Sequence, residues 1–233
     1  MTSIPVRINH TDTLPPAKVN SAMKLVYVGD PMCSWCYGFG KELTALMQQH
    51  PELPLQIIVG GVRAGAKDVL DDSGKQFRLG HWARVEENSG LPFNRAAFMA
   101  LENFVYDTEP VCRAVVTTRK LVPQADLLAV FRALQQGFYV DGRDTTDGRV
   151  LADIAAAALN AAGYAIDAGL FHATWETPEV IAETHADFSR ARAIGVRSFP
   201  ALLLDTGKEF IPVSPGYASH SQLEQQLSRL LAH

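Results

Sequence analysis

The sequence predicts an α/β fold in which the two halves of one small domain are separated by a long helical segment. The first half is a strand–helix–strand pattern over residues 24–59, and the second is a helix–strand–strand–helix pattern from residue 177 onward. Between them, residues 63–176 show helical periodicity and almost no strand pattern. This order of elements places about half of the chain in a helical insertion.

The first half consists of two apolar strands and one helix. The strands are Lys24–Val28, which Asp30-Pro31 ends, and Leu55–Val59, which Gly60-Gly61 closes. The helix is expected over Ser34–Gln49, and it stops before a proline. The second strand is short and rich in Ile and Val, which is typical of a parallel strand that is covered on both faces.

Three helices are recognisable inside the insertion. One opens at Thr108-Glu109-Pro110, because proline is tolerated in the first turn of a helix. Another is capped near Thr146 or Asp147 and ends at Gly163. In the third, apolar residues recur on one helical face at Leu127, Phe131, Leu134 and Phe138.

The second half begins with a helix that opens at Thr177-Pro178 and ends at Gly195, the glycine expected just past a helix. A buried strand is predicted at Ala201–Leu204, and Glu209–Val213 returns as its hairpin partner after a glycine turn. A final amphipathic helix is marked by Leu223, Leu227, Leu230 and Leu231.

These patterns divide the chain into three parts. Residues 23–62 and 177–233 are predicted to form one domain, and residues 63–176 a helical insertion domain that caps it. Residues 1–22 are expected to be a loosely ordered leader, because prolines and scattered polar residues break any pattern there. Within this leader, Val6–Ile8 is a candidate edge strand.

Composition and charge exclude several classes of function. Hydrophobic residues make up 47% of the 233 residues, and the mean hydropathy is +0.00, so an ordinary soluble core is expected. The net charge of -4 and the absence of a long basic run argue against a nucleic-acid partner. No apolar stretch approaches the roughly 20 residues that a membrane span needs, so no membrane partner is expected either.

The N-terminal segment lacks the charged and apolar regions of a secretory signal, so we expect a cytoplasmic protein. Structural disulfides are rare in that compartment, and a reactive cysteine pair there is usually catalytic or metal-binding. The chain has no second C-x-x-C and no H-x-x-x-H spacing, so no metal site is predicted. The pattern leaves the oligomeric state open between a monomer and a homodimer.

Cys33 and Cys36 form a C-x-x-C pair between the first strand and the first helix. At a helix start, free backbone N–H groups and the helix dipole favour a negative charge, so Cys33 is the expected nucleophile. Cys36, one turn later, is the expected resolving thiol. A C-x-x-C in a strand-to-helix turn is typical of a thioredoxin-like redox centre.

Two segments carry a resemblance to a known family. The run Asp30–Tyr37, DPMCSWCY, resembles the active site of DsbA-like thiol:disulfide oxidoreductases, and most closely their cytosolic FrnE-like branch. The run Gly195–Leu202, GVRSFPAL, resembles the cis-proline loop of that family. The similarity covers roughly residues 24–231, and the two motifs together are far more specific than C-x-x-C alone.

The resemblance implies a thioredoxin fold interrupted by an all-helical cap, with Pro200 in the cis form facing the dithiol. It implies substrate binding by Pro200 and by Phe199 just before it. Independently of the resemblance, the position of Trp35 at the helix tip predicts an apolar rim that suits an extended peptide. The implied substrates are protein or peptide disulfides, with no bound cofactor beyond the Cys33–Cys36 pair and with glutathione as a possible co-substrate. The rings of Tyr37 and Phe39 are expected to face inward.

Three further residues are auxiliary candidates around this pair. The hydroxyl of Ser34 can donate a hydrogen bond to sulfur, whereas an ionised Asp30 would oppose thiolate formation. We therefore expect a moderately depressed Cys33 pKa. Cys112 occupies a histidine position in a stretch that weakly resembles FrnE-like relatives. It is either a buried apolar side chain, as most free cysteines are, or a second resolving thiol beside the site.

Two other functions compete with disulfide exchange. Kappa-class glutathione transferases and hydroxychromene-carboxylate isomerases share the fold but usually carry serine where Cys33 stands, and a glutathione-dependent isomerase or transferase is one alternative. The other is a non-catalytic, chaperone-like module that binds peptides. The presence of both cysteines favours disulfide oxidoreductase or isomerase activity. Shared fold alone does not decide between these functions.

Overall fold

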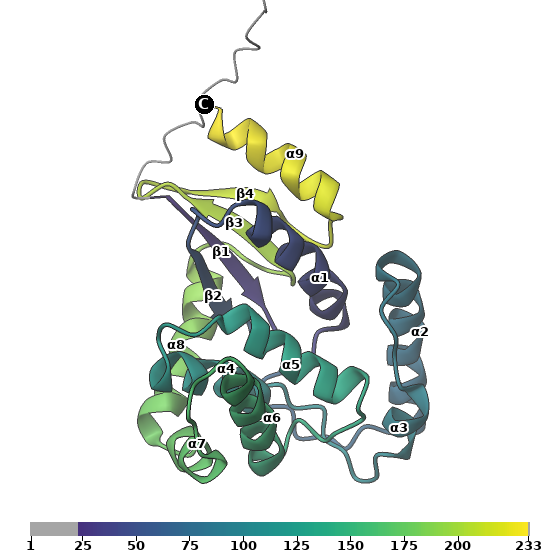
Figure 1. Ribbon diagram of the computed structural model, residues 1–233. Helices are drawn as coiled ribbons and strands as arrows, with labels where there is room; N and C mark the ends of the chain where they lie inside the picture. The colour runs from purple at the N-terminus through teal and green to yellow at the C-terminus, as the bar shows by residue number, and fades with distance from the viewer. Residues whose placement is uncertain (1–22, 233) are drawn as a thin grey trace, which may run out of the picture.

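The computed structural model describes residues 23–232 (Figure 1). In this part of the chain, a four-stranded sheet is joined to a group of helices. The strands are β1 (Lys24–Gly29), β2 (Leu55–Val59), β3 (Ala201–Asp205) and β4 (Phe210–Ser214). The helices are α1 (Ser34–Gln49), α2 (Asp72–Ser89), α3 (Arg95–Ala100), α4 (Glu109–Leu121), α5 (Leu127–Tyr139), α6 (Gly148–Ala161), α7 (Ala168–Trp175), α8 (Pro178–Ala193) and α9 (His220–Leu231).

The sheet has the strand order β2-β1-β3-β4. β1 pairs with β2 in parallel, as the strand–helix–strand pattern predicted, and Tyr27 lies opposite Ile57. β3 runs antiparallel to β1, with Val28 opposite Ala201, and β4 returns beside β3 as a hairpin. The central position of β1 places the loop that follows it next to the start of β3.

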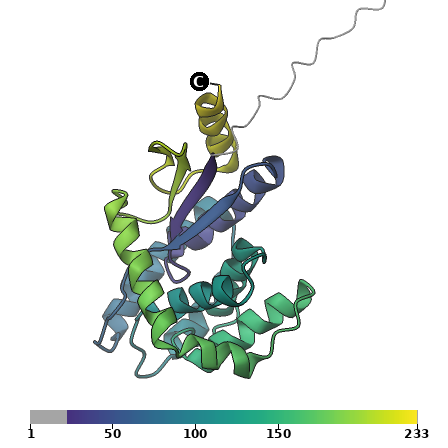
Figure 2. The same cartoon turned by 90° about the vertical axis from the view of Figure 1, so that its left-hand side faces the viewer.

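The two faces of β1 are buried by different helices, because side chains alternate along a strand. Leu25 and Tyr27 belong to the large core beneath α1, and Val26 and Val28 join Ala191 of α8 on the opposite face. Figures 1 and 2 show α1 and α8 on opposite sides of the strands, with α9 beside α1. The sheet is therefore covered on both sides, and this agrees with the apolar character of its central strands.

Helices α3 to α7 lie beyond one end of the sheet, and α2 stands beside α1 (Figure 1). Their core is aromatic: the Trp82 ring is 1% exposed and lies 4.5 Å from the ring of Phe98 and 5.2 Å from that of Tyr139. Aromatic side chains bury more apolar area than other residues, and tilted and edge-to-face contacts between their rings add to the stability of the cluster.

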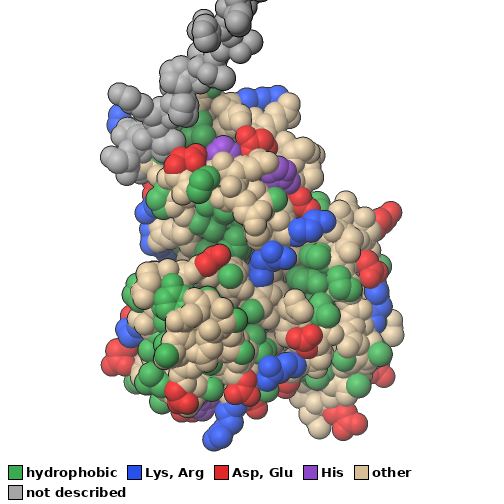
Figure 3. Space-filling model, in the orientation of Figure 1, with side chains coloured by type: hydrophobic (Ala, Val, Ile, Leu, Met, Phe, Trp, Pro, Cys, Tyr) green, Lys and Arg blue, Asp and Glu red, His purple; other side chains and the backbone are tan. Residues whose placement is uncertain are grey.

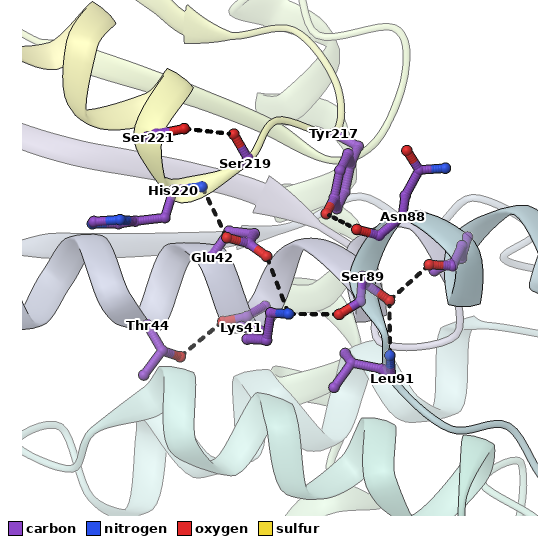
Figure 4. A network of polar contacts seen from close by, with 12 residues as sticks. Lys41, Glu42, Thr44, Asn88, Ser89, Leu91, Tyr217, Ser219, His220 and Ser221 are labelled. Atoms are coloured by element: carbon purple, nitrogen blue, oxygen red, sulfur yellow. Dashed lines mark hydrogen bonds and ion pairs between the residues drawn. The ribbon is translucent and has the colours of Figure 1, made fainter.

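Polar contacts join the helical segment to the sheet domain. On α1, Lys41 donates a 2.5 Å hydrogen bond to the carbonyl of Ser89 at the end of α2, and Glu42 accepts one of 2.8 Å from the backbone N–H of His220 in α9 (Figure 4). Helix α1 is therefore tied on one flank to α2 and on the other to α9.

The structure confirms most of the element boundaries expected from the sequence. The predicted helix around residues 127–138 is α5, Asp147 caps α6 as one of the two expected residues, and Gly195 adopts φ +85 just after α8. Residues 1–22, for which a loosely ordered leader and a candidate edge strand at Val6–Ile8 were predicted, lie outside the described residues. No helix in residues 23–232 combines the length and apolar character that a bilayer span requires.

Candidate active site

Cys33 is the N-cap residue of α1, and its sulfur is at the tip of that helix. Its backbone is extended (φ -83, ψ 116), which directs the side chain toward the free N–H groups of the first turn. Cys33 is partly exposed and Cys36 is fully buried, and both are free thiols. The N-terminus of a helix stabilises an anion, so the geometry favours a thiolate on the more accessible cysteine.

The two sulfurs affect each other's ionisation in opposite directions. A hydrogen bond from the Cys36 thiol, with further help from the backbone N–H groups of Cys36 and Trp35, lowers the pKa of Cys33. Burial and the charge of Asp30 partly oppose this change. Burial raises the pKa of Cys36 well above its usual range, so Cys36 is the proton donor of the pair.

The Phe199–Pro200 peptide bond is cis, as the resemblance implied. The carbonyl oxygen of Phe199 accepts a long hydrogen bond from the Cys33 thiol, with 3.8 Å between sulfur and oxygen. Pro200 is buried, and the half-buried ring of Phe199 packs on Gly60, where an added Cβ would lie 2.3 Å from the ring. The loop of residues 199–200 therefore lies directly beside the nucleophilic sulfur.

Asp30 is buried behind the two cysteines and accepts hydrogen bonds from several segments. Its carboxylate accepts one from the backbone N–H of Met32 at 2.8 Å and one from that of Val62 at 2.7 Å. The side chains of Thr108 and Cys112 are further partners. Burial raises the pKa of Asp30 to about 6, and these hydrogen bonds lower it in part. Its carboxylate joins β1, the loop after β2 and the start of α4.

A comparison with solved structures identifies the family to which this chain belongs. A protein from Nitrosomonas europaea, provisionally described as a protein disulfide isomerase, is 31% identical to this chain, with a TM-score of 0.80. The match covers 90% of this chain and 98% of the other. This chain belongs to the DsbA-like thiol:disulfide oxidoreductase family. No family model and no curated protein sequence matched the chain.

More distant structures agree on the DsbA-like thioredoxin fold. The cytosolic disulfide reductase DsbM from Pseudomonas aeruginosa is 21% identical, with a TM-score of 0.73, over 90% of this chain and all of that chain (100%). A 2-hydroxychromene-2-carboxylate isomerase is 13% identical, with a TM-score of 0.57, over 88% of this chain and 93% of that one. At these identities the likeness concerns the fold, which an oxidoreductase and an isomerase share.

In this DsbA-like protein, Cys112 is both buried and close to the dithiol. It lies in the first turn of α4, is 0% exposed, and donates a hydrogen bond to Asp30. Burial raises the pKa of its thiol well above the usual range. The sequence left open whether Cys112 is an inert buried side chain or a residue beside the site, and its position in the structure agrees with both interpretations. A buried protonated thiol is a poor nucleophile.

The aromatic residues after Cys33 are divided between surface and core. Trp35 is partly exposed, and its ring packs 5.6 Å from that of Tyr217 in the loop before α9. The Tyr217 hydroxyl in turn donates to the carbonyl of Asn88 (Figure 4). Tyr37 and Phe39 face inward, as expected. The side chain of Trp35 is therefore partly open to the surface and partly packed against Tyr217.

Ser34 differs from its expected role. In residues 23–232 its hydroxyl donates no hydrogen bond to either sulfur, and the donors to Cys33 are a thiol and backbone N–H groups. A helix start already supplies such N–H groups, so the hydroxyl is not needed to stabilise the thiolate. Among the same residues, no three His, Cys, Asp or Glu side chains gather in a way that could hold a metal ion.

Sequence reasoning missed two residues that surround the dithiol. Thr108, expected only as the start of a helix, is a buried partner of Asp30, and its hydroxyl also accepts the backbone N–H of Arg63. Tyr27 was counted as one residue of an apolar strand, yet its hydroxyl faces the site. A polar atom in the middle of the apolar run Leu25–Val28 was the one available signal.

A cleft of about 740 Å³ lies between α1 and α5. Tyr37 lies at one end, and Thr44 and Arg132 face each other across it through a 3.0 Å hydrogen bond. Figure 3 shows hydrophobic side chains and basic side chains side by side near the middle of this face. Neither cysteine of the C-x-x-C pair lines this cleft.

Proposed function

We propose that this protein is a dithiol–disulfide oxidoreductase that exchanges disulfides with protein or peptide substrates through Cys33 and Cys36. The observation that carries the proposal is the arrangement of three groups. A partly exposed thiol with a lowered pKa lies at the N-terminus of α1, a buried thiol lies behind it, and the Phe199 carbonyl lies 3.8 Å from the first sulfur.

The proposed reaction has two exchange steps. The Cys33 thiolate attacks one sulfur of the substrate disulfide, the substrate's S–S bond breaks, and the first substrate thiol leaves with a proton. Cys36 then attacks the Cys33 sulfur, a Cys33–Cys36 disulfide forms, and the second substrate thiol leaves. The substrate gains two electrons and the enzyme loses two, so a thiol such as glutathione must reduce the enzyme again.

Substrate binding is assigned to the loop beside Cys33 and to the surface around Trp35. The backbone of an extended peptide can pair with the carbonyl at residue 199, which holds the substrate sulfur close to Cys33. The exposed face of Trp35 offers an apolar contact to neighbouring side chains of the peptide. Shape and backbone contacts would then decide binding more than substrate charge.

Cytoplasmic reduction or isomerisation is the proposed direction. In a reducing compartment the dithiol form is favoured, so the protein would donate electrons to non-native disulfides. DsbM, a cytosolic reductase, shares this fold, and that likeness supports the assignment. The two residues between the cysteines, Ser34 and Trp35, carry no charge, which favours an intermediate reduction potential for the Cys33–Cys36 pair. Glutathione is the proposed partner that returns the enzyme to the dithiol form.

The experiment that tests the proposal measures the Cys33–Cys36 equilibrium against glutathione and the reduction of a peptide disulfide. Cys33→Ser should abolish both steps, and Cys36→Ser should stop turnover and leave a mixed disulfide on Cys33. Cys112→Ser is the matched control and should retain turnover. Turnover that survives Cys36→Ser would instead favour a glutathione-dependent isomerase or transferase. Suppression of aggregation by the Cys33→Ala, Cys36→Ala double variant, without any redox turnover in the native protein, would favour a peptide-binding module.

A further inference from the structure

Tyr27, in the middle of β1, carries a buried hydroxyl that the reaction above does not use. The side chain is 0% exposed, and its oxygen has no hydrogen-bond partner of good geometry among the described residues. Leaving a buried hydroxyl unpaired costs free energy, and a phenylalanine would avoid this cost. The position of the hydroxyl relative to the dithiol offers a reason for its presence.

Packing fixes where the hydroxyl lies. The Tyr27 ring is stacked on Phe39, with 5.7 Å between centroids, and meets Phe131 edge-on at 5.5 Å. The oxygen lies over Gly29, because a Cβ built on that glycine would be 2.4 Å from it. A side chain at residue 29 would therefore displace the tyrosine. The glycine leaves the space that the hydroxyl occupies.

The peptide that follows Gly29 identifies the group that the hydroxyl faces. The backbone N–H of Asp30 donates to the sulfur of Cys36 at 3.5 Å. The Tyr27 oxygen lies over Gly29, directly before this peptide, and is therefore on the side of the same sulfur, although it forms no hydrogen bond of good geometry in this structure. The buried sulfur thus has one backbone donor from the end of β1, and beside it an unpaired side-chain donor in Tyr27.

Both donors keep their protons when the site changes charge. Burial, followed by the negative charge of Cys36, raises the pKa of Tyr27 well above its usual range, so the phenol remains an O–H donor. Hydrogen bonds from the Asp30 N–H and from Tyr27 favour the thiolate of Cys36, against the larger effect of burial. The buried sulfur therefore has a small amount of dedicated anion stabilisation.

We propose that the Tyr27 hydroxyl donates a hydrogen bond to the Cys36 sulfur while that sulfur attacks the mixed disulfide on Cys33. The inference rests on the proposed function and assigns Tyr27 to its second step. Once Cys33 is bonded to substrate, it is no longer a thiolate that accepts the Cys36 proton. The sulfur of Cys36 must then lose that proton inside the protein, where a charge is costly.

The atoms of this step balance without any added reagent. The sulfur of Cys36 forms a bond to that of Cys33 as the bond between Cys33 and the substrate breaks. The departing substrate sulfur takes the electron pair and receives the proton that Cys36 gives up. Tyr27 keeps its own proton throughout and is a positioning residue, not a general base.

Other titratable groups around Cys36 must be separated from Tyr27 in a test of pH dependence. Asp30 and Cys33 are in direct contact with Cys36 or its backbone, and Cys112, Tyr106 and Tyr139 are other buried titratable groups in this part of the core. Tyr139 offers a matched control, because its hydroxyl is also fully buried and without a hydrogen-bond partner of good geometry. Its ring stacks on Tyr37, on the α1 residue directly after Cys36.

The test follows reduced full-length protein after addition of oxidised glutathione, with acid quenching and intact mass to separate the mixed disulfide from the Cys33–Cys36 disulfide. For Tyr27→Phe we expect the mixed disulfide to form within about twofold of the native rate and to resolve about tenfold more slowly, the scale of a lost hydrogen bond to a charged group. The pH midpoint of the resolving step should rise by about one unit. Tyr139→Phe should leave both steps at native rates.

A resolving rate and pH midpoint that are unchanged in Tyr27→Phe would overturn the inference. Equal slowing of resolution in Tyr139→Phe would do the same, because it would indicate a general packing effect. Failure of the native protein to form any mixed disulfide would instead contradict the proposed function. A second measurement does not need turnover: in a Cys33→Ala background, the alkylation of Cys36 should require a pH about one unit higher when Tyr27→Phe is added.

Discussion

The carbonyl oxygen of Phe199 lies 3.8 Å from the sulfur of Cys33, although 166 positions separate the two residues in the chain. The antiparallel pairing of β1 and β3 accounts for this contact, because Val28 lies opposite Ala201 at the start of β3. The end of β1 and the beginning of β3 therefore present their loops at the same edge of the sheet. A reactive thiol and a backbone acceptor for an extended substrate meet there.

The ionisation of Cys33 should depend on Cys36 more than on any other residue. The hydrogen bond from the Cys36 thiol is the largest of the effects that lower the pKa of Cys33. We predict a Cys33 thiolate that titrates below its ordinary value in the native protein, and a higher pKa in Cys36→Ala. Absorbance near 240 nm as a function of pH measures both. A native Cys33 pKa at or above about 8.5 would contradict this prediction.

Asp30 should make the folded protein less stable as the pH rises through the weakly acidic range. Burial raises its pKa from 3.8 to about 6, so the folded state holds this proton more tightly than the unfolded state does. Between these two pH values the unfolding free energy should fall by about 3 kcal/mol on account of Asp30, and the loss should be complete above about pH 6.

Asp30→Asn tests this contribution, because the amide cannot ionise. The measurement is urea unfolding at pH 4 and at pH 7. At pH 4 the variant should be less stable than the native protein, because the NH₂ group of the asparagine would face the N–H donor of Met32 or Val62 and could not accept a hydrogen bond from it. The gap should narrow by about 2 kcal/mol at pH 7, because part of the contribution of Asp30 is already lost at pH 4. Glu102→Gln, at an exposed carboxyl, is the control and should not change the slope. A parallel pH dependence in Asp30→Asn would disprove the assignment.

Gly60 should be required for the position of the loop beside Cys33. A Cβ at residue 60 would lie 2.3 Å from the ring of Phe199, so Gly60→Ala must displace that ring and the carbonyl that contacts Cys33. We expect at least a tenfold loss of peptide-disulfide turnover. Gly80→Ala in α2, where an added Cβ meets nothing within 4 Å, should leave turnover unchanged and stabilise its helix by about 1 kcal/mol. Equal activities in the two variants would refute this role.

Cys112 should remain a thiol throughout the reaction. It is 0% exposed, and burial raises its pKa well above the ordinary value. Mild oxidation of the native protein should therefore yield the Cys33–Cys36 disulfide alone, with the same intact mass change in Cys112→Ser. Peptide mapping that finds a Cys33–Cys112 disulfide in the native protein would show instead that Cys112 acts as a second resolving thiol.

The sequence by itself determined the local parts of this protein. Strand, turn and helix signals around Cys33 and Cys36 lie within a few residues of each other, so the C-x-x-C at a helix start could be predicted without any knowledge of the rest. The caps at Asp147 and Thr177 and the glycine at 195 are equally local, and the helices they bound were predicted close to their observed ends. The resemblance added the cis form of Pro200, which local physics does not determine.

Tertiary structure alone decided which distant groups surround the sulfurs. Asp30 receives hydrogen bonds from Val62, Thr108 and Cys112, and these residues meet only because the loop after β2 and the start of α4 pack against the end of β1. The side chain of Tyr27 lies under α1 because the strand's alternation directs it to that face. Periodicity tells which face of an element is buried, but the partner across that face depends on how remote segments pack, and short-range patterns do not contain that information.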